Sequence, residues 1–392
     1  MARPALALVW DDRFTSYDFG PDHPFTERSR GLAVRLAEEF YRAQAPQQPG
    51  GLVRIPSVES ATRAQILQFH EEPYIHLVER LSAERFPGPL DAGDTPAFPG
   101  CFQAAALIVG GGLEALNHVE NSKAVRSFHP AGGLHHAHPD RASGFCIFND
   151  LAVLLTRWIS PKAGRKRVAY VDIDAHHGDG VMYGFYESSR VLDIDFHQDG
   201  RTLFPGTGFP TETGRKDGVG FKVNLPLPPF SGDEAFLPLF HRVVPPMIRS
   251  FRPELIVLQN GVDAHAGDRL AQLQLTRRSY DFALKTVMDL ADELCDGRLL
   301  VTGGGGYAAA SVSRTLARTA LALAGASPPA DADPLPVGWR REFKEAMKEP
   351  APLDWLENDQ LVRSPWNEDR AEALVSELER SLGVRLPSEA SE

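Results

Sequence analysis

The sequence is poor in cysteine and has no surplus of positive charge. Its 392 residues contain three cysteines, Cys101, Cys146 and Cys295, which are far apart in the chain. An odd and widely spaced set does not suit a disulfide framework, so we expect a reducing compartment, with the cytoplasm as the default location. Lys plus Arg number 41 and Asp plus Glu number 52, which gives a formal net charge of −11. Such a surface repels phosphate backbones, and we therefore expect no direct binding to nucleic acid.

Long apolar runs are also missing. No window approaches the roughly 18 uninterrupted apolar residues that a membrane-spanning helix requires, and even the run Leu316 to Ala326 contains Arg318. The apolar stretch Ala5 to Trp10 runs directly into Asp11-Asp12 and lacks the cleavage site of a signal peptide. We therefore expect no membrane span, and we interpret residues 5–10 as a first buried strand.

What the sequence does contain is an alternation of short apolar runs and longer helical patterns. The expected strands are Ala124–Phe128, Val168–Ile173, Val191–Phe196, Leu255–Gln259 and Leu299–Thr302. The expected helices are Glu27–Arg42, Gln103–Glu120, Asn149–Ile159, Gly232–Ser250, Arg277–Leu294 and Ser311–Ala324. Strands that are apolar on both faces and separated by helices predict an α/β fold, with a central, mostly parallel sheet and helices on both faces.

The composition changes near residue 328. Pro328 to Pro336 form a Pro/Ala/Asp-rich break, and the chain beyond it is more charged, with one clear late helix near Asn367–Leu382. Trp339 and Trp355 favour a segment that packs on the main body, because aromatic side chains contribute large buried areas. We therefore expect a single domain over 1–392, with a catalytic body at 1–327 and a helical C-terminal appendage at 328–392.

Ligand-type side chains follow two of the expected strands. Asp172, Asp174 and His176 alternate as the chain leaves the strand Val168–Ile173, and Asp263 follows Leu255–Gln259. Ligands bind beyond the carboxyl ends of parallel strands in open α/β sheets, where such segments converge. Each residue alone is as well explained by a loop cap or a satisfied histidine. Together they indicate a divalent cation, because several carboxylates ending apolar strands would otherwise cost several kcal/mol in desolvation.

A histidine-rich stretch follows the strand Ala124–Phe128. It contains His129, His135, His136 and His138. Such tracts are found in metal sites and in solvated loops, but the adjacent pair His135-His136 cannot face one ion comfortably from a regular element. We interpret the pair as proton-transfer groups, each oriented by a carboxylate. Asp172 and Asp179 are the expected orienting carboxylates.

Four consecutive glycines, Gly303 to Gly306, follow the strand Leu299–Thr302 and precede Tyr307. A phosphate-binding loop is the alternative, but no Lys-Ser/Thr pair follows the glycines and no G-x-G-x-x-G motif with a downstream acid is present. We interpret the glycines as positions of close backbone approach to a substrate. The Tyr307 phenol is then a hydrogen-bond donor to a developing oxyanion.

Taken together, these motifs resemble the histone deacetylase superfamily. The resemblance rests on His129–Ala137, Gly144-Phe145-Cys146, Asp172–Gly180, Phe204–Gly208, Asp263 and Gly303–Tyr307, and it spans most of residues 1–325. It is strongest to the bacterial acetoin-utilisation-type lysine deacetylases, from Asp22-His23-Pro24 through Asp140–Phe145. It implies an arginase/deacetylase fold and zinc-dependent hydrolysis of acyl-lysine amides.

The resemblance also implies roles for individual residues. Zinc is expected on Asp174, His176 and Asp263, with a water activated beside His136 and with His135 as its electrostatic partner. Fe(II) stays open as the ion, because an Asp-His-Asp set is rich in oxygen. The resemblance further implies a structural K⁺ near the backbone of Asp172, Asp174 and His176, with Asp195-Phe196 nearby.

For the substrate, the resemblance implies a tunnel flanked by Phe145 and Phe204, next to Gly144, that holds the acyl-lysine stem. Tyr307 is expected to polarise the scissile carbonyl, and Asp94 is expected to grip the substrate backbone. An acetylated acyl-CoA synthetase is the protein substrate that kinship to acetoin-utilisation deacetylases suggests.

Three other functions compete with this interpretation. A two-metal ureohydrolase needs a second carboxylate two residues after His176, where this chain has Gly178, and an Asp-x-Asp pair where it reads Asp263-Ala264-His265. An acetylpolyamine amidohydrolase is expected to carry an acidic gatekeeper at the position of Leu270, where the adjacent Arg269 adds repulsion. A non-catalytic sensor would lack a catalytic group, and none is missing. We therefore favour a lysine deacetylase, with the polyamine enzyme as the alternative.

Overall fold

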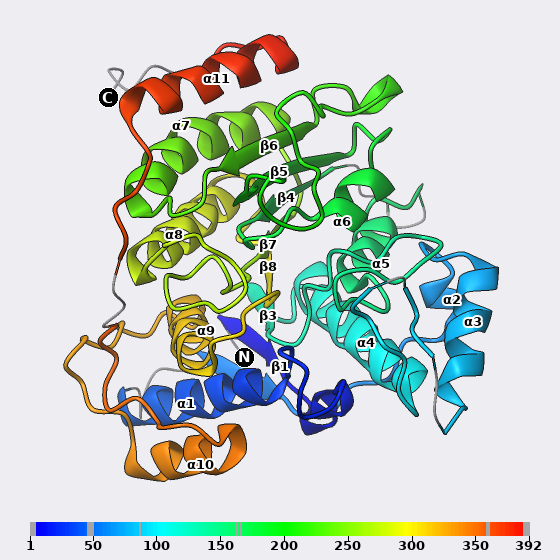
Figure 1. Cartoon of the computed structure of the whole chain (residues 1–392), viewed down its shortest axis with the longest axis vertical. Coiled ribbons are helices and arrows are strands. Elements are labelled where there is room, and N and C mark those ends of the chain that lie inside the picture. Colours follow the sequence, from blue (N-terminus) through cyan, green and yellow to red (C-terminus); the bar gives the residue numbers. More distant parts are fainter. Residues whose placement is uncertain are drawn as a thin grey trace.

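A single eight-stranded parallel sheet forms the centre of the molecule (Figure 1). The computed structural model describes residues 5–44, 51–85, 88–91, 93–161, 164, 167–357 and 361–386. The strands are β1 (Leu6–Val9), β2 (Leu52–Ile55), β3 (Arg126–His129), β4 (Val168–Asp172), β5 (Val191–Gln198), β6 (Lys222–Leu227), β7 (Ile256–Gln259) and β8 (Leu299–Thr302). Their order is β2-β1-β3-β8-β7-β4-β5-β6, and every neighbouring pair is parallel.

Helices cover both faces of this sheet. They are α1 (Arg28–Gln44), α2 (Arg63–Ile66), α3 (Glu72–Ser82), α4 (Cys101–Glu120), α5 (Asp150–Trp158), α6 (Asp179–Gly184), α7 (Asp233–Phe251), α8 (Arg277–Leu294), α9 (Ala309–Leu323), α10 (Val337–Met347) and α11 (Glu368–Leu382), with short 3₁₀ helices at Asp12–Ser16 and Lys216–Gly218. Figure 1 shows α1, α7, α8 and α9 on one side and α4, α5 and α6 on the other. The expected α/β architecture is confirmed.

The strands that the sequence predicted are the six inner strands of the sheet, β1, β3, β8, β7, β4 and β5. All residues of β4, β7 and β8 are buried, as a parallel sheet covered on both sides requires. The two edge strands were missed. β2 is only half-buried, and β6 carries Lys222 and Pro226, so neither reads as a continuous apolar run. The start of β3, Arg126, lies two residues beyond the expected one.

The chain beyond residue 336 contacts the rest of the molecule. Trp339 and Trp355 are 2% and 1% exposed, and Trp339 Nε1 donates a 2.8 Å hydrogen bond to the Leu32 carbonyl in α1. The Trp355 ring meets the Phe40 ring edge-on at 5.0 Å. The boundary between a body at 1–327 and an appendage at 328–392 stays a prediction, and residues 358–360 and 387–392 of that segment lie outside the described residues.

Across the described part of the chain, no helix combines the length and the apolar character needed to cross a membrane. The longest described helix, α4, has 20 residues and contains three consecutive glycines. The three cysteines are buried free thiols.

Candidate active site

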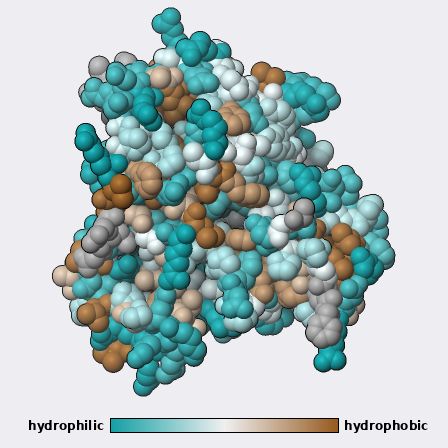
Figure 2. Space-filling view, viewed as in Figure 1, coloured by the Kyte–Doolittle hydropathy of each residue, from teal (hydrophilic) through white to brown (hydrophobic). Residues whose placement is uncertain are grey.

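The side chains singled out in the sequence gather where β3, β4, β7 and β8 end. Parallel pairing brings the carboxyl ends of these strands to one edge of the sheet. In the strand register, His129 pairs with Thr302, and Gln259 pairs with both Thr302 and Asp172. Figure 2 shows a hollow near the middle of the face above this region, bordered by apolar surface. A small cavity here is lined by residues from several loops, including His136, His176 and Tyr307.

Asp174, His176 and Asp263 form a buried group that could hold a metal ion. One potential ligand atom from each residue lies within 4.8 Å of the other two. The His176 Nδ1 atom is 3.2 Å from Asp174 Oδ1 and 3.0 Å from Asp263 Oδ2. Asp172 is not part of this group, because its Oδ2 atom is 2.8 Å from His135 Nδ1.

The donor set suits a divalent cation. Asp174 Oδ2 accepts hydrogen bonds from Gln259 Nε2 at 2.9 Å and Gly305 N at 2.7 Å, while Asp263 Oδ1 accepts one from Ala175 N at 2.7 Å. The second oxygen of each carboxylate faces His176. Burial and the neighbouring Asp174 charge raise the pKa of Asp263 to about 7. Two buried carboxylates with oxygen atoms within 4.8 Å of each other require a compensating cation. Zinc accepts a ligand set of one imidazole nitrogen and two carboxylate oxygens.

Gly305 makes this arrangement sterically feasible. A Cβ atom at this position would lie 1.9 Å from Asp263 Oδ2 and 2.9 Å from Asp174 Oδ2. The glycine-rich segment therefore approaches the two carboxylates closely, whereas the sequence suggested an approach to a substrate. Gln259 was not assigned a role from the sequence, although it is the last residue of β7 and four residues before Asp263.

Two histidine–aspartate pairs lie beside the metal-type group. His135 Nδ1 is 2.8 Å from Asp172 Oδ2, and His136 Nδ1 is 2.7 Å from Asp179 Oδ1. The two Nε2 atoms are 3.1 Å apart. Burial and the nearby His135 lower the pKa of His136 to about 4. Burial opposes the charged form of His135, but Asp172 and Asp174 outweigh it and raise its pKa to about 10. At neutral pH the pair therefore consists of one neutral and one protonated imidazole.

Asp179 has a second histidine partner that the sequence did not identify. His138 Nε2 lies 3.0 Å from Asp179 Oδ2, and both side chains are buried. Burial favours the protonated carboxyl, but hydrogen bonds from His136 and His138 outweigh it and hold the pKa of Asp179 well below its usual range. The spacing His136-x-His138 was the available signal, because alternate residues of an extended segment face the same side.

Tyr307 is fixed through its backbone. Its N–H donates a 2.8 Å hydrogen bond to Asp268 Oδ2, and the other oxygen of Asp268 accepts the N–H of Leu270 at 2.8 Å. Burial raises the pKa of Tyr307 well above its usual value, so the phenol keeps its proton. Asp268 therefore ties the Tyr307 loop to the Leu270 loop, a role that the sequence did not reveal.

Phe145 and Phe204 lie close to these groups. The Phe204 ring is 5.0 Å from the His136 ring and the Phe145 ring is 5.9 Å from the Tyr307 ring, measured between centroids. Phe145 has a left-handed backbone, with φ of 66°, which is uncommon for an aromatic residue and is typical of constrained functional segments. A Cβ at the preceding Gly144 would lie 2.4 Å from His136 Cδ2, so this position requires glycine.

The remaining expected substrate residues are on the exposed rim. Asp94 is exposed, and its neighbour Thr95 accepts the N–H of Phe145 at 3.0 Å through Oγ1. Leu270 is 41% exposed. The buried Phe25 also lines the small cavity, although the sequence assigned it no role. Its position directly after the Asp22-His23-Pro24 motif was the signal that could have identified it.

The fold and this arrangement of side chains are those of a deacetylase-type hydrolase. The Histone deacetylase domain model matches residues 28–323, and the chain belongs to the histone deacetylase family. It is 34% identical over 355 residues to the acetoin utilization protein AcuC of Bacillus subtilis (strain 168), with 89% of each chain covered. Similar relatives are AcuC of Staphylococcus aureus (strain MRSA252), 34% identical over 89% of each chain, and AcuC of Staphylococcus xylosus, 32% identical over 95% of this chain and 96% of the relative.

Proposed function

We propose that the protein is a zinc-dependent lysine deacetylase that hydrolyses the acyl-lysine amide of a protein substrate. The observation that carries this proposal is that Asp174 and His176 line the same cavity as His136 and Tyr307. A candidate metal group, a neutral imidazole and a protonated phenol thus surround one small volume. Fe(II) is the alternative ion for the same three ligands.

Asp174, His176 and Asp263 would hold the ion. When bound, zinc supplies a Lewis acid that polarises the amide carbonyl and lowers the pKa of water toward roughly 7. The chain's own residues then have separate tasks. His136 is neutral and accepts the proton of the attacking water, while Asp179 holds the opposite ring nitrogen.

Charge on the carbonyl oxygen is stabilised by Tyr307. Its phenol is protonated and donates a hydrogen bond to the developing oxyanion, an interaction worth about 3 kcal/mol in comparable sites. As the carbon–nitrogen bond breaks, the proton held on the His136–His135 pair passes to the lysine nitrogen. His135 remains paired with Asp172, which offsets the positive charge.

The rim fits a neutral acyl-lysine on a polypeptide. Phe145 and Phe204 offer apolar surface to the methylene stem, and the exposed Asp94 can accept a hydrogen bond from the substrate backbone. An acetylated acyl-CoA synthetase is the protein substrate we propose, supported by the likeness to acetoin utilization proteins. For an acetylpolyamine we would expect a carboxylate at position 270, where this chain has leucine.

One experiment separates these alternatives. Metal-free protein is reconstituted with one equivalent of Zn²⁺ or Fe²⁺ and assayed on an acetyl-lysine peptide and on acetylspermidine. Turnover confined to the peptide supports a protein deacetylase, and the more active ion identifies the metal. Turnover mainly on acetylspermidine would contradict the substrate class but not the hydrolytic site. No turnover on either substrate with either ion would contradict the proposed function.

Two further proposals follow from the family. A monovalent cation such as K⁺ is proposed near the backbone of Asp172, Asp174 and His176. Both carboxylate oxygens of the nearby Asp195 already have partners, Gly178 N at 2.7 Å and His197 Nδ1 at 2.6 Å, so backbone carbonyls would supply most ligands. A higher melting temperature in KCl than in LiCl at equal ionic strength would support the K⁺ site, and identical melting temperatures would contradict it.

A cytoplasmic location is proposed from the few, widely spaced cysteines.

A further inference from the structure

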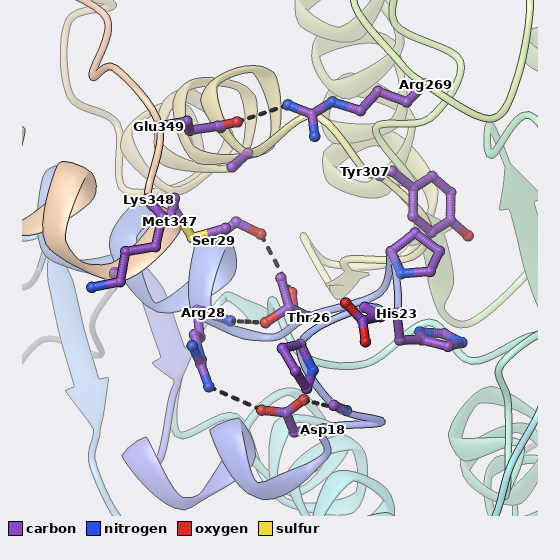
Figure 3. A pocket seen from close by; sticks show the side chains of 17 residues that line it. Asp18, His23, Thr26, Arg28, Ser29, Arg269, Tyr307, Met347, Lys348 and Glu349 are labelled. Carbon is purple, nitrogen blue, oxygen red and sulfur yellow. Dashed lines mark hydrogen bonds and ion pairs between the residues drawn. The ribbon is translucent and has the colours of Figure 1, made fainter.

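A second and larger cavity adjoins the candidate active site. It has a volume of about 510 Å³, within the range of ligand pockets, and the proposed chemistry does not use it. Three parts of the chain form its walls: the segment 18–29 before and at the start of α1, the loops around Arg269 and Tyr307, and residues 346–349 at the end of α10 (Figure 3). The C-terminal segment therefore contributes one wall.

This cavity is continuous with the rim of the active site. Tyr307 lines both the small cavity and the larger one. His23 also lines the larger cavity, its ring lies 4.5 Å from the Phe145 ring, and its Nε2 is 3.3 Å from the Asp94 carbonyl oxygen. Figure 3 shows Tyr307 and His23 at one end of the cavity and Lys348 at the opposite end. A chain that leaves the tunnel mouth beside Tyr307 can therefore extend toward Lys348.

Most charges in the cavity wall are already paired. Arg28 Nη2 is 3.0 Å from Asp18 Oδ2, and Arg269 Nη2 is 2.7 Å from Glu349 Oε2. Two charged side chains in this wall, Asp22 and Lys348, make no ion pair within the described part of the chain. Lys348 is exposed and lies at the end remote from Tyr307, so its ammonium group is available to an acidic side chain of a ligand.

The position of Lys348 is set by the backbone. Lys348 ends α10 in a left-handed conformation, with φ of 58°, and its N–H donates to the Lys344 carbonyl at 3.1 Å. This turn places Lys348 and Glu349 in the wall of the cavity. Glycine is the residue that best tolerates such a cap, so Lys348→Gly removes the ammonium group and leaves the turn in place.

We propose that this cavity binds the polypeptide segment next to the acyl-lysine, and that Lys348 selects substrates with an acidic side chain in that segment. The inference rests on the proposed deacetylase function and adds a class of protein substrate to it. Arg269, which precedes Leu270 at the tunnel mouth, is held by Glu349 of the C-terminal segment. The C-terminal segment thus shapes the substrate surface.

The test compares three kinds of substrate on zinc-loaded protein. The first is a single acetyl-lysine with blocked ends, which has no neighbouring side chain that could pair with Lys348. The others are acetyl-lysine peptides that carry Glu or Lys at each of four positions on either side. Wild type, Lys348→Gly and Lys348→Glu are compared, and Lys344→Glu serves as a control, because Lys344 is exposed on α10 and does not line the cavity.

We expect wild type to prefer Glu over Lys at one or more positions by about two- to fivefold in kcat/KM, the range of a single exposed ion pair. Lys348→Gly removes this preference, Lys348→Glu reverses it, and both variants hydrolyse the blocked acetyl-lysine at the wild-type rate. Lys344→Glu keeps the wild-type preference. If the preference for Glu over Lys is the same in wild type and in the two Lys348 variants, this inference is overturned and the proposed deacetylase function still stands. Absence of turnover on every substrate, including the blocked acetyl-lysine, would instead overturn the proposed function and this inference with it.

Discussion

His138 Nε2 lies 3.0 Å from Asp179 Oδ2, on the carboxylate oxygen opposite to the one that faces His136. Asp179 is thereby held from two sides, and its rotation would break one hydrogen bond or the other. Since Asp179 orients His136, we infer that His138 is a positioning residue for the proposed proton acceptor.

We expect His138→Phe to lower kcat by roughly 10- to 100-fold with little change in KM, as for other partners that orient a reacting group. His138→Gln keeps a donor near Asp179 and should recover part of the loss. Steady-state kinetics of both variants, with circular dichroism to confirm folding, makes the test. Equal losses in the two variants, or a loss confined to KM, would contradict a positioning role.

Tyr307→Phe should reduce kcat by roughly 10²- to 10³-fold, because the proposed oxyanion loses one preorganised donor. Metal content should not change, since Tyr307 is not in the candidate metal group. Asp268→Asn should give a smaller loss, because it weakens the hydrogen bonds that hold the Tyr307 and Leu270 backbones but leaves the phenol in the site. Steady-state kinetics measures the change in kcat, and elemental analysis measures the metal content. Wild-type turnover by Tyr307→Phe would exclude the proposed role of the phenol.

Removal of metal should lower both activity and stability. The two buried carboxylates of Asp174 and Asp263 lose their compensating cation, and an ion present at 1,000 times its Kd contributes about 4 kcal/mol to the folded state. We expect elemental analysis to find one zinc or iron ion per chain in wild type and none in Asp263→Asn. A melting temperature that does not change when a chelator is added would argue against a metal in this group.

Gly305→Ala tests the steric side of the same site. The new methyl group would lie 1.9 Å from Asp263 Oδ2, so the carboxylate must move and metal affinity should fall. Gly338→Ala is the matched control, since its Cβ meets nothing within 4 Å. Competition with a metal-binding dye measures both affinities. Equal affinities in the two variants would mean that Asp263 is not a ligand.

Glu27 makes stability depend on pH. Its side chain is buried, and burial raises its pKa to about 8, from about 4.5 in the unfolded chain, although the Arg30 guanidinium, 3.8 Å away, opposes this rise. Between these values the unfolded chain is ionised and the folded chain is not, so this group destabilises the fold progressively as pH rises from about 4.5 to 8. Glu27→Gln should therefore raise the melting temperature relative to wild type more at pH 8 than at pH 5. A difference that is constant over this range would contradict the assignment.

The sequence by itself determined the central strands and the chemical types in the site. β4, β7 and β8 are buried on both faces, and runs that are mostly apolar suit that environment, so their pattern is visible without a structure. Asp174, His176 and Asp263 stand just beyond such strands, and parallel pairing forces strand ends to one edge of the sheet. Their meeting could therefore be anticipated.

Only the tertiary structure decided which side chains pair across distant segments. Asp268 meets the backbone of Tyr307 across 39 residues, and Glu349 meets Arg269 across 80 residues. Such contacts depend on loop conformations, which have no periodic pattern in sequence. The edge strands β2 and β6 were hidden for a related reason, because a strand paired on one side only does not need to be uniformly apolar. The cavity beside Tyr307 likewise depends on the tertiary structure, because the end of α10 and the segment before α1 both contribute to its walls.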